Sequence, residues 1–141
     1  MSDQRQLGVD LFNEVWRLLE TRRDDDRMLH AAHASRYHWG QAPECKPENL
    51  ARGEWQVSRV YVVLARAEPA IWHAQRCLTH CEDAGIAGWD LAYAYEALAR
   101  AHALAGNAEA EEWKAKAHSA GEAISDPEDR ELFDEDFATL P

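Results

Sequence analysis

Histidine and cysteine, which serve as metal ligands and as catalytic groups, occur seven and three times in this chain. His73, Cys77 and Cys81 follow one another at steps of four residues, so on a helix they share one face. Two neighbours of this set could bind one metal ion with ligands from another helix. All three cannot share it, because the helical rise places His73 and Cys81 about 12 Å apart. The alternative is that Cys77 packs as a small apolar side chain, as buried cysteine does.

The stretch from His30 to Trp39 is a second place where polar chemistry gathers, with His30, His33, Ser35 and Tyr37 close in sequence. It could form a small active or metal site, or its rings could be buried and hydrogen-bonded locally. The zinc-protease pattern of two histidines four residues apart is not present, and neither is a nucleophile elbow. A glycine-rich phosphate loop is also missing, which excludes the common nucleotide-binding designs.

Charge and composition exclude further classes of protein. The net charge is −11, and residues 106–141 hold 11 acidic against 3 basic side chains. Nucleic acid is therefore not an expected partner, because a phosphate binder needs a basic stripe. The sequence has no apolar run of about 18 residues, so we expect no membrane span. An odd number of cysteines, two of them close together in one predicted helix, favours a reducing compartment and a cytoplasmic location.

The elements that must position these residues are helices. Apolar residues recur at helical spacing between glycine and proline breaks, and no segment alternates as a strand does. The pattern predicts an all-α chain that forms a single domain over residues 1–141. We expect three helix pairs and one final helix, at about residues 7–41, 48–85, 89–121 and 126–138.

Two of these pairs resemble the tetratricopeptide repeat, which places small residues where two helices cross. The positions that carry the resemblance are Ser58, Tyr61, Ala65, Ala70, Cys77 and Leu78 in one pair, and Ala99, His102, Ala110 and Ala117 in the next. The resemblance implies an α-solenoid of about three helix pairs with a C-terminal capping helix. It also implies that the small residues of this set, Ala65 included, are buried at helix contacts.

In tetratricopeptide-like stacks the first helix of each pair lines a concave groove that binds ligands. The corresponding positions are Asn13, Trp16 and Arg17, then Arg52, Trp55 and Arg59, and finally Tyr93, Glu96 and Arg100. Arginine side chains suit a carboxylate or phosphate group of a ligand, and aromatic side chains supply apolar anchors. The final helix either caps the last pair or folds back to place its acids on the groove arginines.

These features predict a binding or scaffolding module, for which the sequence indicates no cofactor and assigns no catalytic activity. The expected partner is another protein or an acidic peptide, with a homodimer as a further arrangement. The alternative is a small helical metal-binding protein or enzyme that uses the His33 to Trp39 segment together with His73, or His73, Cys77 and Cys81 as ligands.

Overall fold

The computed structural model describes residues 2–141, and over this range the chain forms seven α-helices and no strand. The helices are α1 (Asp3–Thr21), α2 (Asp25–Gln41), α3 (Pro47–Val63), α4 (Ala67–Asp83), α5 (Gly88–Ala105), α6 (Ala110–Glu122) and α7 (Pro127–Phe137). They lie where the sequence predicted helices, except that α1 already begins at Asp3. The all-α class is thus confirmed for the described residues.

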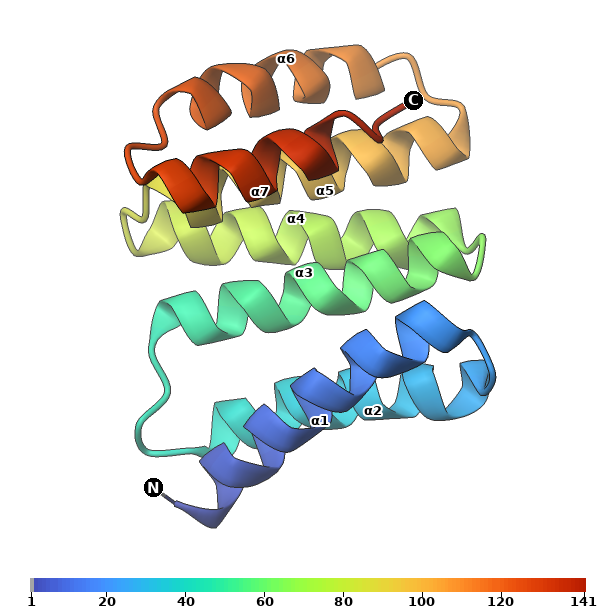
Figure 1. Cartoon of the computed structure of the whole chain (residues 1–141), viewed down its shortest axis with the longest axis vertical. Helices are drawn as coiled ribbons and strands as arrows, with labels where there is room; N and C mark the ends of the chain where they lie inside the picture. The colour runs from blue at the N-terminus through green and yellow to red at the C-terminus, as the bar shows by residue number, and fades with distance from the viewer. Residues whose placement is uncertain (1) are drawn as a thin grey trace.

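Successive helices form antiparallel pairs that follow one another along the long axis of the molecule (Figure 1). Within the pairs, α1 packs on α2, α3 on α4 and α5 on α6. Between the pairs, α2 contacts α3, α4 contacts α5, and α3 also contacts α5. The last helix, α7, lies against both α5 and α6. The first helices α1, α3 and α5 therefore lie in sequence along the stack, and α7 lies next to α5.

Local sequence explains where the helices begin and end. The side chains of Ser2, Asp24 and Asp126 accept hydrogen bonds from backbone N–H groups in the first turns of α1, α2 and α7. Pro47 and Pro127 occupy the first turns of α3 and α7, where a missing N–H costs nothing. These caps fix the register in which each helix presents its side chains.

Small residues lie at the helix crossings, as the sequence predicted, with one exception. Six of the seven expected positions are buried: Ser58, Ala70, Cys77, Ala99, Ala110 and Ala117. The Ser58 hydroxyl donates a hydrogen bond of 2.8 Å to the Ala70 carbonyl, which joins α3 to α4. The prediction for Ala65 was wrong: it is exposed, because it lies in the turn between these helices with a φ of 59°.

The apolar core follows the stack as three clusters. One joins α1, α2 and α3, the second joins α3, α4 and α5, and the third joins α5, α6 and α7. Their most buried large members are Val15, Met28 and Val57, then Leu78 and Leu98, and finally Phe133. None of the helices in residues 2–141 has the length and apolar character needed to cross a membrane.

Candidate binding groove

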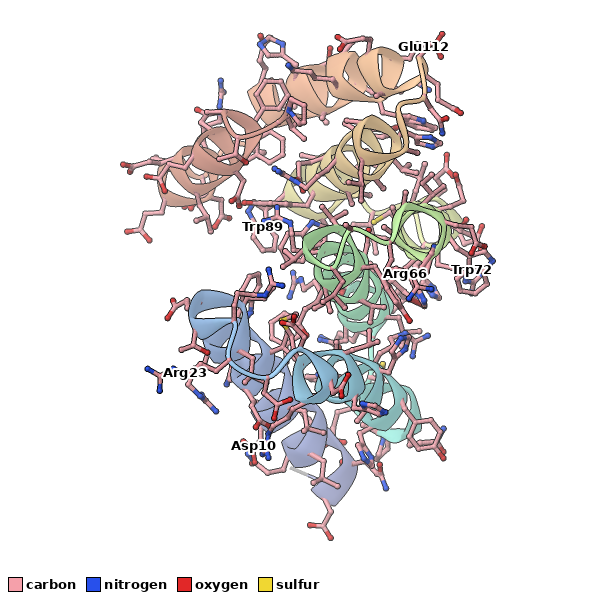
Figure 2. All side chains as sticks on the ribbon, turned by 90° about the vertical axis from the view of Figure 1, so that its right-hand side faces the viewer. Asp10, Arg23, Arg66, Trp72, Trp89 and Glu112 are labelled. Carbon is pink, nitrogen blue, oxygen red and sulfur yellow. The ribbon has the colours of Figure 1, made fainter. Side chains whose placement is uncertain are left out.

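A pocket of about 570 Å³ opens between the first helices of the pairs and α7. Its walls come from α1, α3, α5 and α7, and α4 contributes only Cys77. The lining residues are Phe12, Trp16, Ala51, Arg52, Trp55, Cys77, Trp89, Asp90, Tyr93, Leu132 and Asp136. Figure 2 shows Trp89 between α7 and α1, whereas Trp72 lies on the opposite side of the molecule. A volume of this size is typical of ligand pockets.

An aromatic row runs through this pocket from α1 to α7. We define it as Phe12, Trp16, Trp55, Tyr93, Trp89 and Phe133. Neighbouring ring centroids lie 5.9 Å apart for Phe12 and Trp16, 5.5 Å for Trp16 and Trp55, and 5.4 Å for Trp55 and Tyr93. Tyr93 then contacts Trp89 at 4.9 Å and Phe133 at 5.1 Å, mostly edge to face. Such pairs hold the rings in fixed orientations, so the apolar wall is preformed.

Two of the predicted groove arginines converge on a carboxylate of the chain itself. Glu96 is fully buried and accepts hydrogen bonds from Arg59 at 3.0 Å and Arg100 at 2.7 Å. The indole N–H of Trp55 donates a third bond of 3.1 Å to the same carboxylate. Both oxygens of Glu96 are thereby occupied, which satisfies the requirement that a buried charge be paired.

Another of the predicted groove arginines, Arg52, is also paired with a carboxylate at the pocket. Arg52 forms a two-point ion pair with Asp90, with distances of 2.8 and 3.0 Å, and its guanidinium lies over the Trp89 ring. The hydrogen bond to Asp90 raises the pKa of Arg52 above its usual value. Planar two-point pairing fixes the direction of both side chains.

The helix α7 is attached to α6 by apolar packing and to α5 by both apolar and polar contacts. Phe133 is buried and lies against Gly121 of α6, where an added Cβ would collide with its ring. The Tyr93 hydroxyl donates to the Asp136 carboxylate at 2.6 Å, and Arg100 donates to the Asp136 carbonyl and the Thr139 hydroxyl. Burial and the neighbouring Asp136 carboxylate raise the pKa of the Tyr93 hydroxyl. The final helix therefore caps the last pair and also forms one wall of the pocket.

Four of the nine residues that the sequence predicted for the groove line this pocket. Trp16, Arg52, Trp55 and Tyr93 line the pocket, and Arg59, Glu96 and Arg100 form the charge cluster beside it. Asn13 and Arg17 are exposed on α1 and do not line it. The groove prediction missed the other lining residues, which are Phe12, Ala51, Cys77, Trp89, Asp90, Leu132 and Asp136. Phe12 and Asp90 could have been predicted from helical register, because they lie one turn from Trp16 and Tyr93, respectively, on the same helix faces.

The histidine and cysteine candidates are distributed over separate environments. His73 Nδ1 lies 2.8 Å from the Glu54 carboxylate, whereas Cys77 and Cys81 are buried in the core with free thiols. The hydrogen bond with Cys81 and burial raise the pKa of Cys77. Within residues 2–141, no three histidine, cysteine or acidic side chains lie close enough together to hold a metal ion.

Part of the His30 to Trp39 segment belongs to a polar cluster between α2, α3 and α4. We call it the α2–α4 polar cluster and define it as His33, Arg36, Glu54, Tyr61, His73 and His80. His33 Nε2 lies 2.9 Å from the Tyr61 hydroxyl, and the His33 and His73 rings are 5.4 Å apart. The structure thus brings together the two histidines that the alternative prediction combined.

Burial and neighbouring charges shift the pKa values in the α2–α4 polar cluster. Burial lowers the pKa of His33 and of His80, and the neighbouring His73 and Arg36 lower them further. Burial by itself would raise the pKa of Glu54. The hydrogen bond from His73 and the positive charge of Arg36 have the larger effect, so the pKa of Glu54 is lowered. Ser35 lies apart from the cluster, buried with its hydroxyl bonded to the Gly8 carbonyl at 2.7 Å.

The groove therefore offers a preformed apolar surface, and the arginines at and beside it are paired with carboxylates of the chain. Surfaces of this kind bind a partner through contact area and shape. The α2–α4 polar cluster, in contrast, lies among packed helices and joins them by hydrogen bonds. Comparisons of the chain with protein-family models, with curated proteins and with solved structures give no match.

Proposed function

We propose that this chain is a tetratricopeptide-like binding module whose pocket receives a bulky apolar side chain from a segment of another protein. The contacts of α2 with α3 and of α4 with α5 support the repeat-like assignment, because each pair packs on the next as in a stacked array. The three free thiols support a cytoplasmic setting for it.

One observation carries this proposal: two exposed apolar side chains face the same pocket from opposite walls. Trp16 on α1 is 36% exposed and Leu132 on α7 is 48% exposed, and both line the pocket together with the aromatic row. Apolar groups that water reaches at a preformed pocket are typical of the anchor sites of protein interfaces.

A selection from a random library of 12-residue displayed peptides tests the proposal. The wild-type chain is compared with the double variant Trp16→Ala/Leu132→Ala. The matched control is Trp72→Ala/Leu104→Ala, which also removes one exposed tryptophan and one exposed leucine, but outside the pocket. Circular dichroism melts establish that all three chains are folded.

Peptides selected on the wild type should bind the control variant equally well. They should bind the pocket variant at least about tenfold more weakly, because apolar anchors carry most of the energy of such contacts. Equal binding to both variants would refute the proposal. Sedimentation at several concentrations tests whether a second copy of the chain occupies the pocket instead. If the wild type forms a dimer and Trp16→Ala/Leu132→Ala is a monomer, the pocket is an interface between two copies of the chain.

A further inference from the structure

Each of the groove arginines Arg52, Arg59 and Arg100 already has a carboxylate partner within the chain. Arg52 is bound at two points by Asp90, and Arg59 and Arg100 share the buried Glu96. An acidic ligand would have to compete with these carboxylates, of which Glu96 is fully buried and has no access to water. Arg59 and Arg100 together carry one positive charge more than Glu96, but hydrogen bonds within the chain fix both guanidinium groups. The arginines therefore shape the groove and are poorly placed to bind an acidic peptide.

One carboxylate of the pocket lacks such a positive partner. The side chain of Asp136 accepts a hydrogen bond from the neutral Tyr93 hydroxyl, while Arg100 binds only its backbone carbonyl. No ion pair in residues 2–141 involves the Asp136 carboxylate. It lines the pocket next to Leu132, one turn away on α7. A cation that entered the pocket could pair with it directly.

The surroundings of Asp136 also favour a cation. The helix α7 contains six acidic residues against Arg130, and this arginine pairs with Asp134 of the same helix. The helix therefore carries a net charge of −5, in agreement with the excess of acids in the last quarter of the chain. The aromatic row adds ring faces, which attract cations: Arg59 already lies over the Trp55 ring at 5.1 Å.

From this charge pattern we infer that the pocket selects a basic segment, in which a lysine or arginine next to the apolar anchor pairs with Asp136. The inference rests on the proposed function and adds the charge of the ligand to it. The apolar side chain contacts Trp16 and Leu132, and the cation lies between the Asp136 carboxylate and the rings of the aromatic row. Electrostatic complementarity then decides which apolar segments are accepted.

The peptide selection described above provides the first test through the composition of the selected sequences. Lysine and arginine should be enriched next to the apolar anchor. Enrichment of apolar residues without a charge preference, or with aspartate and glutamate, would overturn the inference and leave the proposed function intact. A selection that does not differ between the wild type and Trp16→Ala/Leu132→Ala would overturn both.

A second test assigns the preference to Asp136. Fluorescence anisotropy measures the Kd of one selected peptide and of its counterpart with glutamine in place of the basic residue. The variant Asp136→Asn keeps an acceptor for the Tyr93 hydroxyl and removes the charge. Glu131→Gln is the matched control, since it removes one charge from an exposed position of α7 outside the pocket.

Asp136→Asn should weaken binding of the basic peptide about fivefold and leave the glutamine peptide unchanged. Glu131→Gln should change either Kd by less than about twofold. The preference for the basic peptide should also shrink between 0.05 and 0.5 M NaCl, roughly the range over which the Debye length falls well below 10 Å. Equal losses in the two variants would overturn the assignment to Asp136.

Discussion

Glu96 accepts hydrogen bonds from three donors beside the pocket, so Glu96→Leu tests how much this charge cluster stabilises the fold. The substitution leaves the guanidinium groups of Arg59 and Arg100 and the Trp55 indole N–H without their common acceptor. Removal of one partner from a buried pair costs about 3–5 kcal/mol. The arginine side chains keep 19% and 13% exposure, so water can reach part of each and the loss should fall near about 3 kcal/mol.

Urea unfolding followed by far-UV circular dichroism measures this loss. Glu96→Gln keeps an acceptor and should cost less, about 1–2 kcal/mol. Asp134→Ala is the control: it breaks the exposed pair with Arg130 and should change the free energy of unfolding by about 0.5 kcal/mol or less. A loss below about 1 kcal/mol for Glu96→Leu, or one that disappears in 1 M NaCl, would refute the role of Glu96 as a buried anchor.

Three further predictions concern α7, the α2–α4 polar cluster and the thiols. Gly121→Ala should lower the free energy of unfolding by about 1–3 kcal/mol, because the new Cβ collides with the Phe133 ring; an unchanged melting temperature would contradict this. The pKa of His80 in the folded chain is lowered from 6.5, so at mildly acidic pH the unfolded chain protonates this histidine more readily than the folded chain does. The free energy of unfolding should therefore fall as the pH decreases below about 7. His80→Gln should flatten that decline in melts between pH 7.5 and 5.5, and an equally steep profile would count against it. Iodoacetamide labelling followed by mass spectrometry should modify Cys45 before the buried Cys77, whose pKa is raised; the reverse order would be inconsistent with the packing.

The periodic part of the structure could be predicted from the sequence. Apolar spacing, Pro47 and Pro127 locate the helices. The faces predicted for the first helices include Trp16, Trp55 and Tyr93, which line the pocket. Trp55 and Tyr93 were found in this way, because their positions depend only on the register within one helix. Helical register is a local property, and local properties are encoded within a few residues.

The charge pairing could not be predicted, because it depends on distances between helices. The Arg52 and Asp90 side chains are separated by 38 residues in sequence, and Trp55 and Glu96 by 41. Glu96 was expected on the groove surface, but the inward packing of α5 buries it completely. The contribution of Leu132 depends on how α7 docks on α5 and α6, which includes the close packing of Phe133 against Gly121.

The shortness of α7 has a consequence for the way in which the pocket is formed. An isolated helix of 11 residues is marginal in water, so α7 owes its helical structure to docking on α5 and α6. Undocking and melting of this helix are therefore one event, with a free energy smaller than that of global unfolding. Any ligand that contacts Leu132 or Asp136 adds its binding free energy to the docked form alone. Amide hydrogen exchange in residues 127–137 thus reports occupancy of the pocket, even when the rest of the stack exchanges at its usual rate.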